Sequence, residues 1–169
     1  MAKIEAIKDM VIGMQVLKPE TTTKSDVSKP SPQMHVGNDD NGLGKKEIIQ
    51  IKEALKELKV GVDYGKIPGV EEDVLFKKGA RKILKKLKYR YTESMVEKTI
   101  DIPNGFIGYT MKVCVISGSG NIVAESHGSA NSLESKFMKK GLSSDHLLTL
   151  VASKRALLDC VKSIIAECF

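Results

Sequence analysis

Tryptophan is absent from this sequence of 169 residues, and four tyrosines and four phenylalanines supply all of its aromatic rings. Recognition of a partner by stacking on aromatic side chains is therefore secondary, and recognition by charge comes first. No apolar run is long enough to cross a bilayer, and the first residues lack the apolar core of a signal peptide. From these absences we expect a cytoplasmic protein that does not enter the membrane.

Cysteine and histidine are also scarce, and their spacing is not that of a metal site. The three cysteines lie at positions 114, 160 and 168 and the three histidines at positions 35, 127 and 146, without a C-x-x-C pair. An odd number of widely spaced cysteines is typical of free, reduced thiols in a cytoplasmic protein. We therefore expect no disulfide and no bound metal.

Motifs of catalysis are missing as well. The stretch Gly61–Lys66 (GVDYGK) lacks the spacing and the serine or threonine of a phosphate-binding loop. The acids at 71–73 are adjacent rather than convergent, and His127 has no serine or cysteine partner in the pattern. We expect that the protein is not an enzyme and needs no cofactor.

Positive charge is what the sequence has in excess. It contains 27 Lys and Arg against 21 Asp and Glu, a formal charge of +6. Eight of the fourteen residues in Lys77–Arg90 are basic and none is acidic. Like charges three and four residues apart on a helix repel each other, so an external anion should offset this repulsion.

Three segments differ in composition. Residues 1–17 alternate charged and apolar residues and predict a short amphipathic segment, whereas residues 18–44 are rich in Pro, Ser, Thr, Gly and Asp. The second segment has too few large apolar groups to offset the entropy lost on ordering, so we expect a flexible linker. Residues 45–169 should form one folded domain.

Within this domain the hydrophobic periodicity changes from helical to strand-like and back. The expected elements are helices over 45–59 and from about 77, strands over 93–101, 106–116 and 122–129, a polar connection over 129–143, and a helix from Ser144 or Asp145 to the end. This order predicts an α+β fold, in which a curved antiparallel three-stranded meander packs on the long C-terminal helix.

The last helix carries an interruption in its apolar stripe. The stripe consists of Leu147, Leu150, Val151, Leu158, Val161, Ile164, Ile165 and Cys168. Lys154 and Arg155 fall where this pattern calls for core residues. Either both side chains reach water, with Arg155 pairing to Asp159, or an anion covers the middle of the helix.

Several of these strings together resemble the Rad52 family of single-strand annealing proteins. The string GFIGYTMKVCVISGSGNIVAESHGSANSLESK at 105–136 is similar to the family's strand, turn, strand and small-residue connection. Lys154, Arg155, Ala156 and Leu157 match the Lys-Arg-Ala-Leu motif of the family's last core helix. The string KKGARKILKKLKY is similar to its Gly-x-Arg segment. Residues 63–84 also resemble short recombination-associated proteins of phages and mobile elements.

The resemblance implies a Rad52-like fold and a function in homologous recombination. Such a protein binds single-stranded DNA without sequence preference and anneals complementary strands, as a homo-oligomeric ring or helical filament. Its expected DNA-binding residues here are Lys154, Arg155, Arg81, Lys77, Lys78, Lys82, Lys85, Lys86, Lys112, Lys136 and Lys139. We expect Arg81, Lys154 and Arg155 to line an inner groove, and the other lysines a more exposed surface. Further partners would be a single-strand-binding protein or a nuclease, and in a bacterium or phage the location would be the nucleoid.

Two alternatives stay open at this point. A double-stranded-RNA-binding module also combines a three-stranded meander with a basic C-terminal helix, but its lysines lie near the start of that helix. Here the Lys-Arg pair comes about ten residues after the expected start. The other alternative is an adaptor whose basic face binds an acidic protein.

Overall fold

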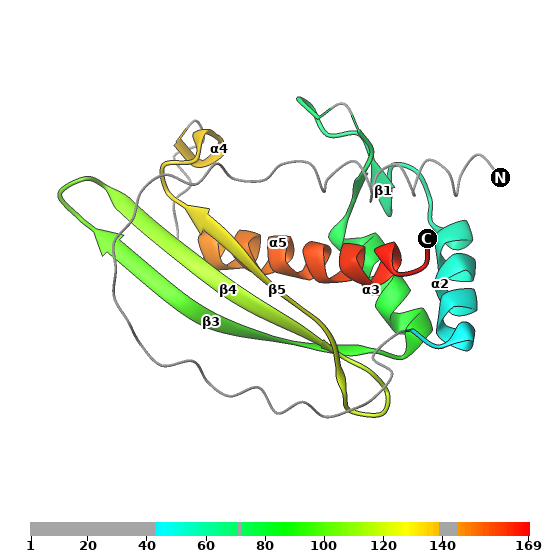
Figure 1. Cartoon of the computed structure of the whole chain (residues 1–169). Helices are drawn as coiled ribbons and strands as arrows, with labels where there is room; N and C mark the ends of the chain where they lie inside the picture. The colour runs from blue at the N-terminus through cyan, green and yellow to red at the C-terminus, as the bar shows by residue number, and fades with distance from the viewer. Residues whose placement is uncertain (1–42, 71, 139–144) are drawn as a thin grey trace.

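The computed structural model describes residues 43–70, 72–138 and 145–169. Its elements in chain order are α2 (Lys45–Glu57), β1 (Tyr64–Gly65), β2 (Val74–Leu75), α3 (Lys77–Leu87), β3 (Arg90–Asp101), β4 (Phe106–Ile116), β5 (Ile122–Asn131), α4 (Ser135–Met138) and α5 (Asp145–Ala166) (Figure 1). The expected segments at 1–17 and 18–44 lie outside the described residues, except for the last two positions of the second.

The three long strands form one antiparallel sheet in the order β3-β4-β5 (Figure 1). The turns that join them contain Gly105 at φ 63° and Gly120 at φ 94°, conformations that favour glycine. A β-bulge interrupts the ladder of β3 and β4 between Met95 and Glu97. The described residues therefore confirm the predicted α+β class, with a three-stranded antiparallel sheet and a C-terminal helix.

Helix α5 packs on β4 and β5 and leaves β3 largely uncovered. Gly128 of β5 permits this contact, because a Cβ atom there would lie 2.3 Å from the carbonyl oxygen of Ala152 and 2.5 Å from the amide nitrogen of Ala156. Val113 and Val115 of β4 are fully buried in the core. Helix and sheet thus meet through small residues on both sides.

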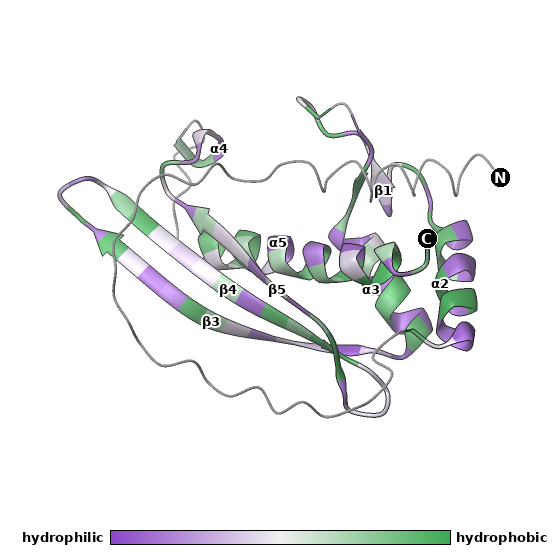
Figure 2. Cartoon of the chain, in the orientation of Figure 1, coloured by the Kyte–Doolittle hydropathy of each residue, from purple (hydrophilic) through white to green (hydrophobic). Residues whose placement is uncertain are grey.

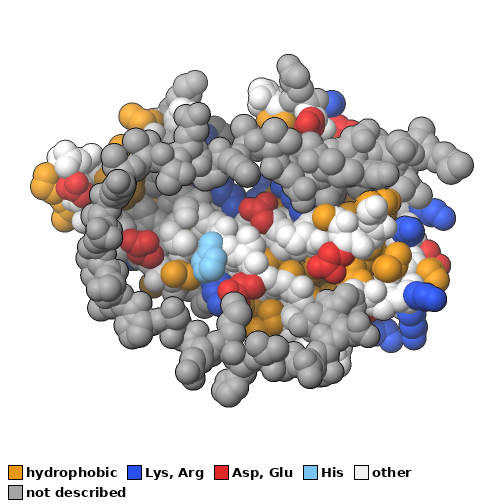
Figure 3. Space-filling view, in the orientation of Figure 1, with side chains coloured by type: hydrophobic (Ala, Val, Ile, Leu, Met, Phe, Trp, Pro, Cys, Tyr) orange, Lys and Arg blue, Asp and Glu red, His pale blue; other side chains and the backbone are white. Residues whose placement is uncertain are grey.

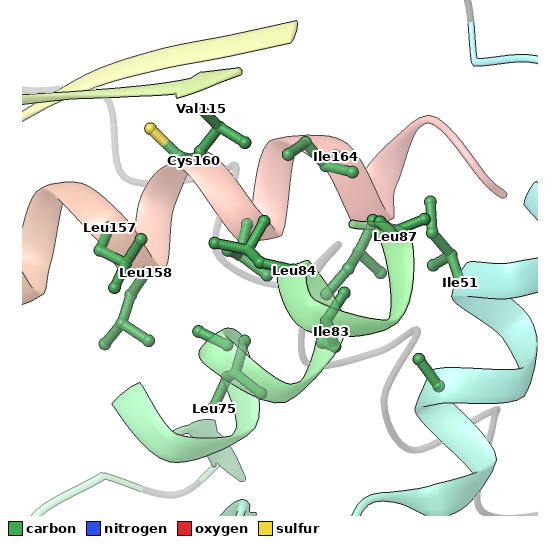
Figure 4. Packing of buried hydrophobic residues seen from close by; sticks show 14 of the residues in the cluster. Ile51, Leu75, Ile83, Leu84, Leu87, Val115, Leu157, Leu158, Cys160 and Ile164 are labelled. Carbon is green, nitrogen blue, oxygen red and sulfur yellow. The ribbon is translucent and has the colours of Figure 1, made fainter. Parts of the chain in front are cut away.

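The main core lies where α2, α3 and the second half of α5 meet the sheet. Figure 4 shows Ile51 of α2, Ile83 and Leu84 of α3, and Leu157 and Ile164 of α5, which belong to one buried cluster. A smaller apolar cluster joins the first half of α5 to Tyr109 and Ala130 of the sheet and to Phe137 of α4. Figure 2 shows the corresponding hydrophobic and hydrophilic faces along α2 and α3. These clusters fix the positions of the basic helices relative to the sheet.

Some details differ from the sequence-based predictions. Strand β3 begins at Arg90 rather than at residue 93, and residues 64–65 and 74–75 form a small antiparallel pair where we expected a loop. Leu150, predicted to face the core, is 44% exposed, whereas Leu157 is fully buried. A single apolar stripe does not describe the buried surface of α5, because the helix is covered by the sheet on one side and by α3 on another. None of the described helices is long and apolar enough to span a membrane.

Candidate nucleic-acid interface

The basic residues of α3 divide into two sides of the helix. On the side toward α2, Lys82 Nζ donates to the Glu57 carbonyl at 2.6 Å and lies 3.4 Å from the buried Asp63 carboxylate. Lys86 Nζ lies 2.9 Å from Glu57 Oε1. These contacts lower the pKa of Glu57 and raise that of Lys86, because each stabilises the charged form of its partner. Lys82 and Lys86 therefore hold α3 against α2.

The other side of α3 carries exposed cations. Lys78, Arg81 and Lys85, spaced by three and four residues, share one face, which we call the α3 stripe. None of the three has an ion-pair partner among the residues that the structure describes. The stripe runs for about 10 Å along the helix. Figure 3 shows Lys and Arg side chains gathered at the end of the molecule formed by α2 and α3.

Arg81 is held at the middle of the stripe by the sheet. Its Nε and Nη2 atoms donate to the Tyr91 hydroxyl on β3, at 3.1 and 3.0 Å. A neutral hydroxyl orients the guanidinium without cancelling its charge, so Arg81 keeps donors for an anion. The flanking Lys77 and Lys88 likewise lack an ion pair within the described segments.

Arg155 on α5 is occupied within the chain. Its Nη1 and Nη2 atoms donate to the two carboxylate oxygens of Glu134, at 2.8 and 2.7 Å, and Nη1 also donates to the Ser129 carbonyl. Arg155 lowers the pKa of Glu134 from 4.5 to about 2, since it stabilises the carboxylate. The suggested pairing of Arg155 with Asp159 is wrong, and Asp159 instead lies 3.4 Å from Lys162.

Lys154, the other half of the motif, is exposed and has no ion-pair partner in the described ranges. Its neighbour Arg155 stays partly accessible, with 42% of its side chain exposed. The motif thus supplies one free lysine and one arginine that a ligand would have to share with Glu134.

Two of the cations assigned to one inner groove contact different strands of the sheet. Arg81 contacts Tyr91 on β3, whereas Arg155 contacts Ser129 on β5. These strands are the two edges of the sheet, with β4 between them. Within one chain, Arg81 and Arg155 therefore contact the two opposite edge strands of the sheet.

Two further expected contacts are internal ion pairs. Lys112 Nζ lies 2.7 Å from Glu125, and Lys136 Nζ lies 3.1 Å from Glu134 and over the Phe137 ring. Lys139 lies outside the described residues. The role of Glu134 could not be predicted from the sequence, since an acid inside a polar connection carries no signal that it will reach an arginine 21 residues away.

The tyrosines that could stack on bases are mostly in the core. Tyr64 and Tyr89 are 4% and 8% exposed, and the Tyr89 hydroxyl donates to Glu47 Oε1. Tyr91 is half-buried, and its hydroxyl accepts a hydrogen bond from Arg81 of the α3 stripe. Within the described residues, no three His, Cys, Asp or Glu side chains form a group that could hold a metal ion.

No protein-family model matches the chain, and no curated protein matches its sequence.

Proposed function

We propose that this protein binds single-stranded DNA without sequence preference and anneals complementary strands. The observation that carries the proposal is the α3 stripe, where Lys78, Arg81 and Lys85 lie exposed on one face without an ion-pair partner in the described structure. Phosphate groups would relieve the repulsion among these charges and release counterions on binding.

A single strand fits this surface better than a folded or duplex target. The α3 stripe is short, it lies on one helix, and Tyr91 beside Arg81 offers one partly exposed ring. Contacts to the backbone leave the base edges free to pair, which is what annealing of any sequence requires. Lys77 and Lys88 at the two ends of α3 would extend the binding surface to neighbouring phosphates.

The annealing part of the proposal rests on the order of elements and on the Rad52-like motifs. A helix, a three-stranded meander and a long helix with Lys-Arg-Ala-Leu follow each other in the part of the chain that carries the resemblance. Annealing needs two strands on one particle, so the protein would act as an oligomer, by binding alone and without catalysis. In such an oligomer, Arg81 of one subunit and Lys154 of another could line one track.

The test compares labelled single-stranded DNA, duplex DNA, duplex RNA and polyglutamate in anisotropy titrations over a series of salt concentrations. Annealing of two labelled complementary strands is followed beside them. We expect the single strand to bind most tightly, with a steep salt dependence, and annealing to accelerate. Preferred binding of duplex RNA would favour an RNA-binding module, and preferred binding of polyglutamate an adaptor of acidic proteins. Either result would contradict the proposal.

A further inference from the structure

Strand β3 is a long edge strand that is exposed on both faces. It spans twelve residues, and all except Tyr91 and Asp101 are exposed, including Met95 at 58%, Val96 at 55% and Ile100 at 52%. One of its edges pairs with β4, and no strand of the described structure pairs with the other (Figure 1). An uncovered edge of this length, with apolar side chains, is a template for pairing with another strand.

The sequence of β3 is complementary to itself when reversed. In the string RYTESMVEKTID, the first residue is Arg90 and the last is Asp101, and Glu93 mirrors Lys98. The full set of mirrored pairs is Arg90 with Asp101, Tyr91 with Ile100, Thr92 with Thr99, Glu93 with Lys98, Ser94 with Glu97, and Met95 with Val96. Opposite charges meet in two of these six pairs, apolar or aromatic side chains in two, and hydroxyls in one, while Ser94 faces Glu97 in the sixth.

We propose that β3 pairs antiparallel with β3 of a second copy of this chain, about a two-fold axis that passes between Met95 and Val96. The two three-stranded sheets then join into one continuous sheet. Pairing along β3 would form on the order of ten backbone hydrogen bonds. It would also bring together the exposed side chains of Met95 and Val96 at the axis.

The β-bulge makes this register possible. Facing residues of an antiparallel pair lie on the same face of a sheet. When a regular strand pairs with its own copy, the two facing residue numbers must therefore be both odd or both even. The mirrored pairs combine an odd with an even position, so they would fail in a regular strand. In β3 the bulge between Met95 and Glu97 shifts the alternation by one residue, at the centre of the mirror.

The register with β4 places the two residues of five mirrored pairs on a common face of the sheet, and Val96 of the central pair is the extra residue of the bulge. Tyr91 lies opposite the buried Val115, and Ile100 lies opposite Ile107, which packs in the cluster beneath α5. Both side chains of this mirrored pair therefore lie on the α5 side of the sheet. On the opposite face, Thr92 lies opposite Cys114 and Thr99 opposite Gly108.

The charged residues of β3 are available for such a contact. Arg90 and Glu93 have no ion-pair partner in the described parts of the chain. Lys98 Nζ lies 3.0 Å from Asp145, and its ammonium group has a further donor for Glu93 of a second copy. A two-fold axis repeats every one of these pairs, so each favourable contact counts twice. This inference stands independently of DNA binding.

Charge reversal tests the pairing. Glu93→Lys would face Lys98 of the second copy, and Lys98→Glu would face Glu93, so each variant alone should dimerise about tenfold to a hundredfold more weakly. Mixing the two variants restores both opposite-charge pairs and should yield heterodimers. The matched control is Glu97→Lys, the same charge change on the same strand opposite the neutral Ser94. Masses are measured by analytical ultracentrifugation without DNA.

Cysteine crosslinking tests the register without altering charge. Thr92→Cys combined with Thr99→Cys, in a Cys114→Ser background, should form reducible covalent dimers, because the two positions face each other across the axis. Within one chain they are about 24 Å apart along the strand, which excludes an internal disulfide. Each single cysteine variant is the control and should stay uncrosslinked.

These measurements decide the proposal even if Lys98→Glu, which also loses its contact with Asp145, fails to fold. Crosslinked dimers of the double cysteine variant support it, as does a heterodimer of the two charge variants. The proposal is overturned if the wild-type protein is monomeric and the double cysteine variant forms no crosslink. The β3 edge would then be covered by another segment or partner. If Glu97→Lys weakens dimerisation as much as Glu93→Lys does, the proposed register is wrong.

Discussion

Arg155 and Glu134, 21 residues apart in the sequence, form a bidentate ion pair, with the guanidinium nitrogens 2.8 and 2.7 Å from the two carboxylate oxygens. The same arginine binds the Ser129 carbonyl at the end of β5. A residue expected to face a ligand thus also joins the connection after β5 to α5. Arg155 consequently differs from its neighbour Lys154, although the two are adjacent in one motif.

This contact predicts different effects of the two motif residues on stability. Arg155→Ala leaves the partly buried Glu134 carboxylate without its main partner and should lower the free energy of unfolding by about 1–3 kcal/mol. Lys154→Ala removes an exposed side chain and should change it by less than about 0.5 kcal/mol. Urea unfolding of both variants measures this. Equal effects would mean that the ion pair contributes nothing to the fold.

The Glu134 carboxylate also predicts a dependence on pH. Its pKa is lowered from 4.5 to about 2 in the folded protein, so the stabilisation is complete above about pH 4.5 and is lost as the pH falls toward about 2. Wild type should therefore exceed Glu134→Gln in stability at about pH 6 and lose most of this advantage by about pH 2. A stability difference that stays constant over this range would contradict the assignment.

Two adjacent lysines of α3 should behave differently in DNA binding. Lys85 belongs to the α3 stripe, whereas Lys86 lies 2.9 Å from Glu57. Lys85→Gln should weaken single-strand binding several-fold and reduce the slope of log affinity against log salt by about 0.7, the effect of one phosphate contact. Lys86→Gln removes the same charge and should leave both nearly unchanged. Equal losses would indicate a diffuse basic surface instead of a stripe.

The contact of β5 with α5 makes Gly128 sensitive to the smallest substitution. Gly128→Ala would place a Cβ atom 2.3 Å from the Ala152 carbonyl oxygen, so helix or strand must shift. We expect a loss of about 1–3 kcal/mol in the free energy of unfolding. Gly118→Ala is the control, since no atom lies within 4 Å of its added Cβ. Thermal unfolding of the two variants checks this, and equal stability of both would mean that α5 lies farther from β5.

The thiols should react with iodoacetamide in a fixed order. Burial raises the pKa of Cys160 to about 12 and also raises the pKa values of Cys168 and Cys114, so all three stay protonated at neutral pH. Cys160 and Cys168 are buried, whereas Cys114 is partly exposed. Alkylation followed by mass spectrometry should therefore modify Cys114 first and the other two upon unfolding. Rapid modification of Cys160 in the folded protein would show that α5 opens locally.

Several elements of the fold could be predicted from sequence because their signals are local. Alternation of apolar and polar residues in Phe106–Ile116 identifies β4, and Gly120 occupies a turn conformation that favours glycine. Helix α5 begins at Asp145, as predicted, because aspartate side chains accept hydrogen bonds from the free amide groups at a helix start. The α+β class followed from the order of these elements, since a meander must cover its apolar face with a helix.

The tertiary structure alone decided which cations are free. Lys82 meets the Asp63 carboxylate from 19 residues away, Lys86 meets Glu57 from 29 residues away, and Arg155 meets Glu134 from 21 residues away. Spacing along one helix cannot show this, because the partner acids lie on other elements that only packing brings near. The sequence by itself therefore determined that α3 carries excess positive charge. The fold decided that Lys78, Arg81 and Lys85 keep this charge without an ion-pair partner in the described structure, whereas Lys82 and Lys86 on the adjacent side of the helix are paired with acids.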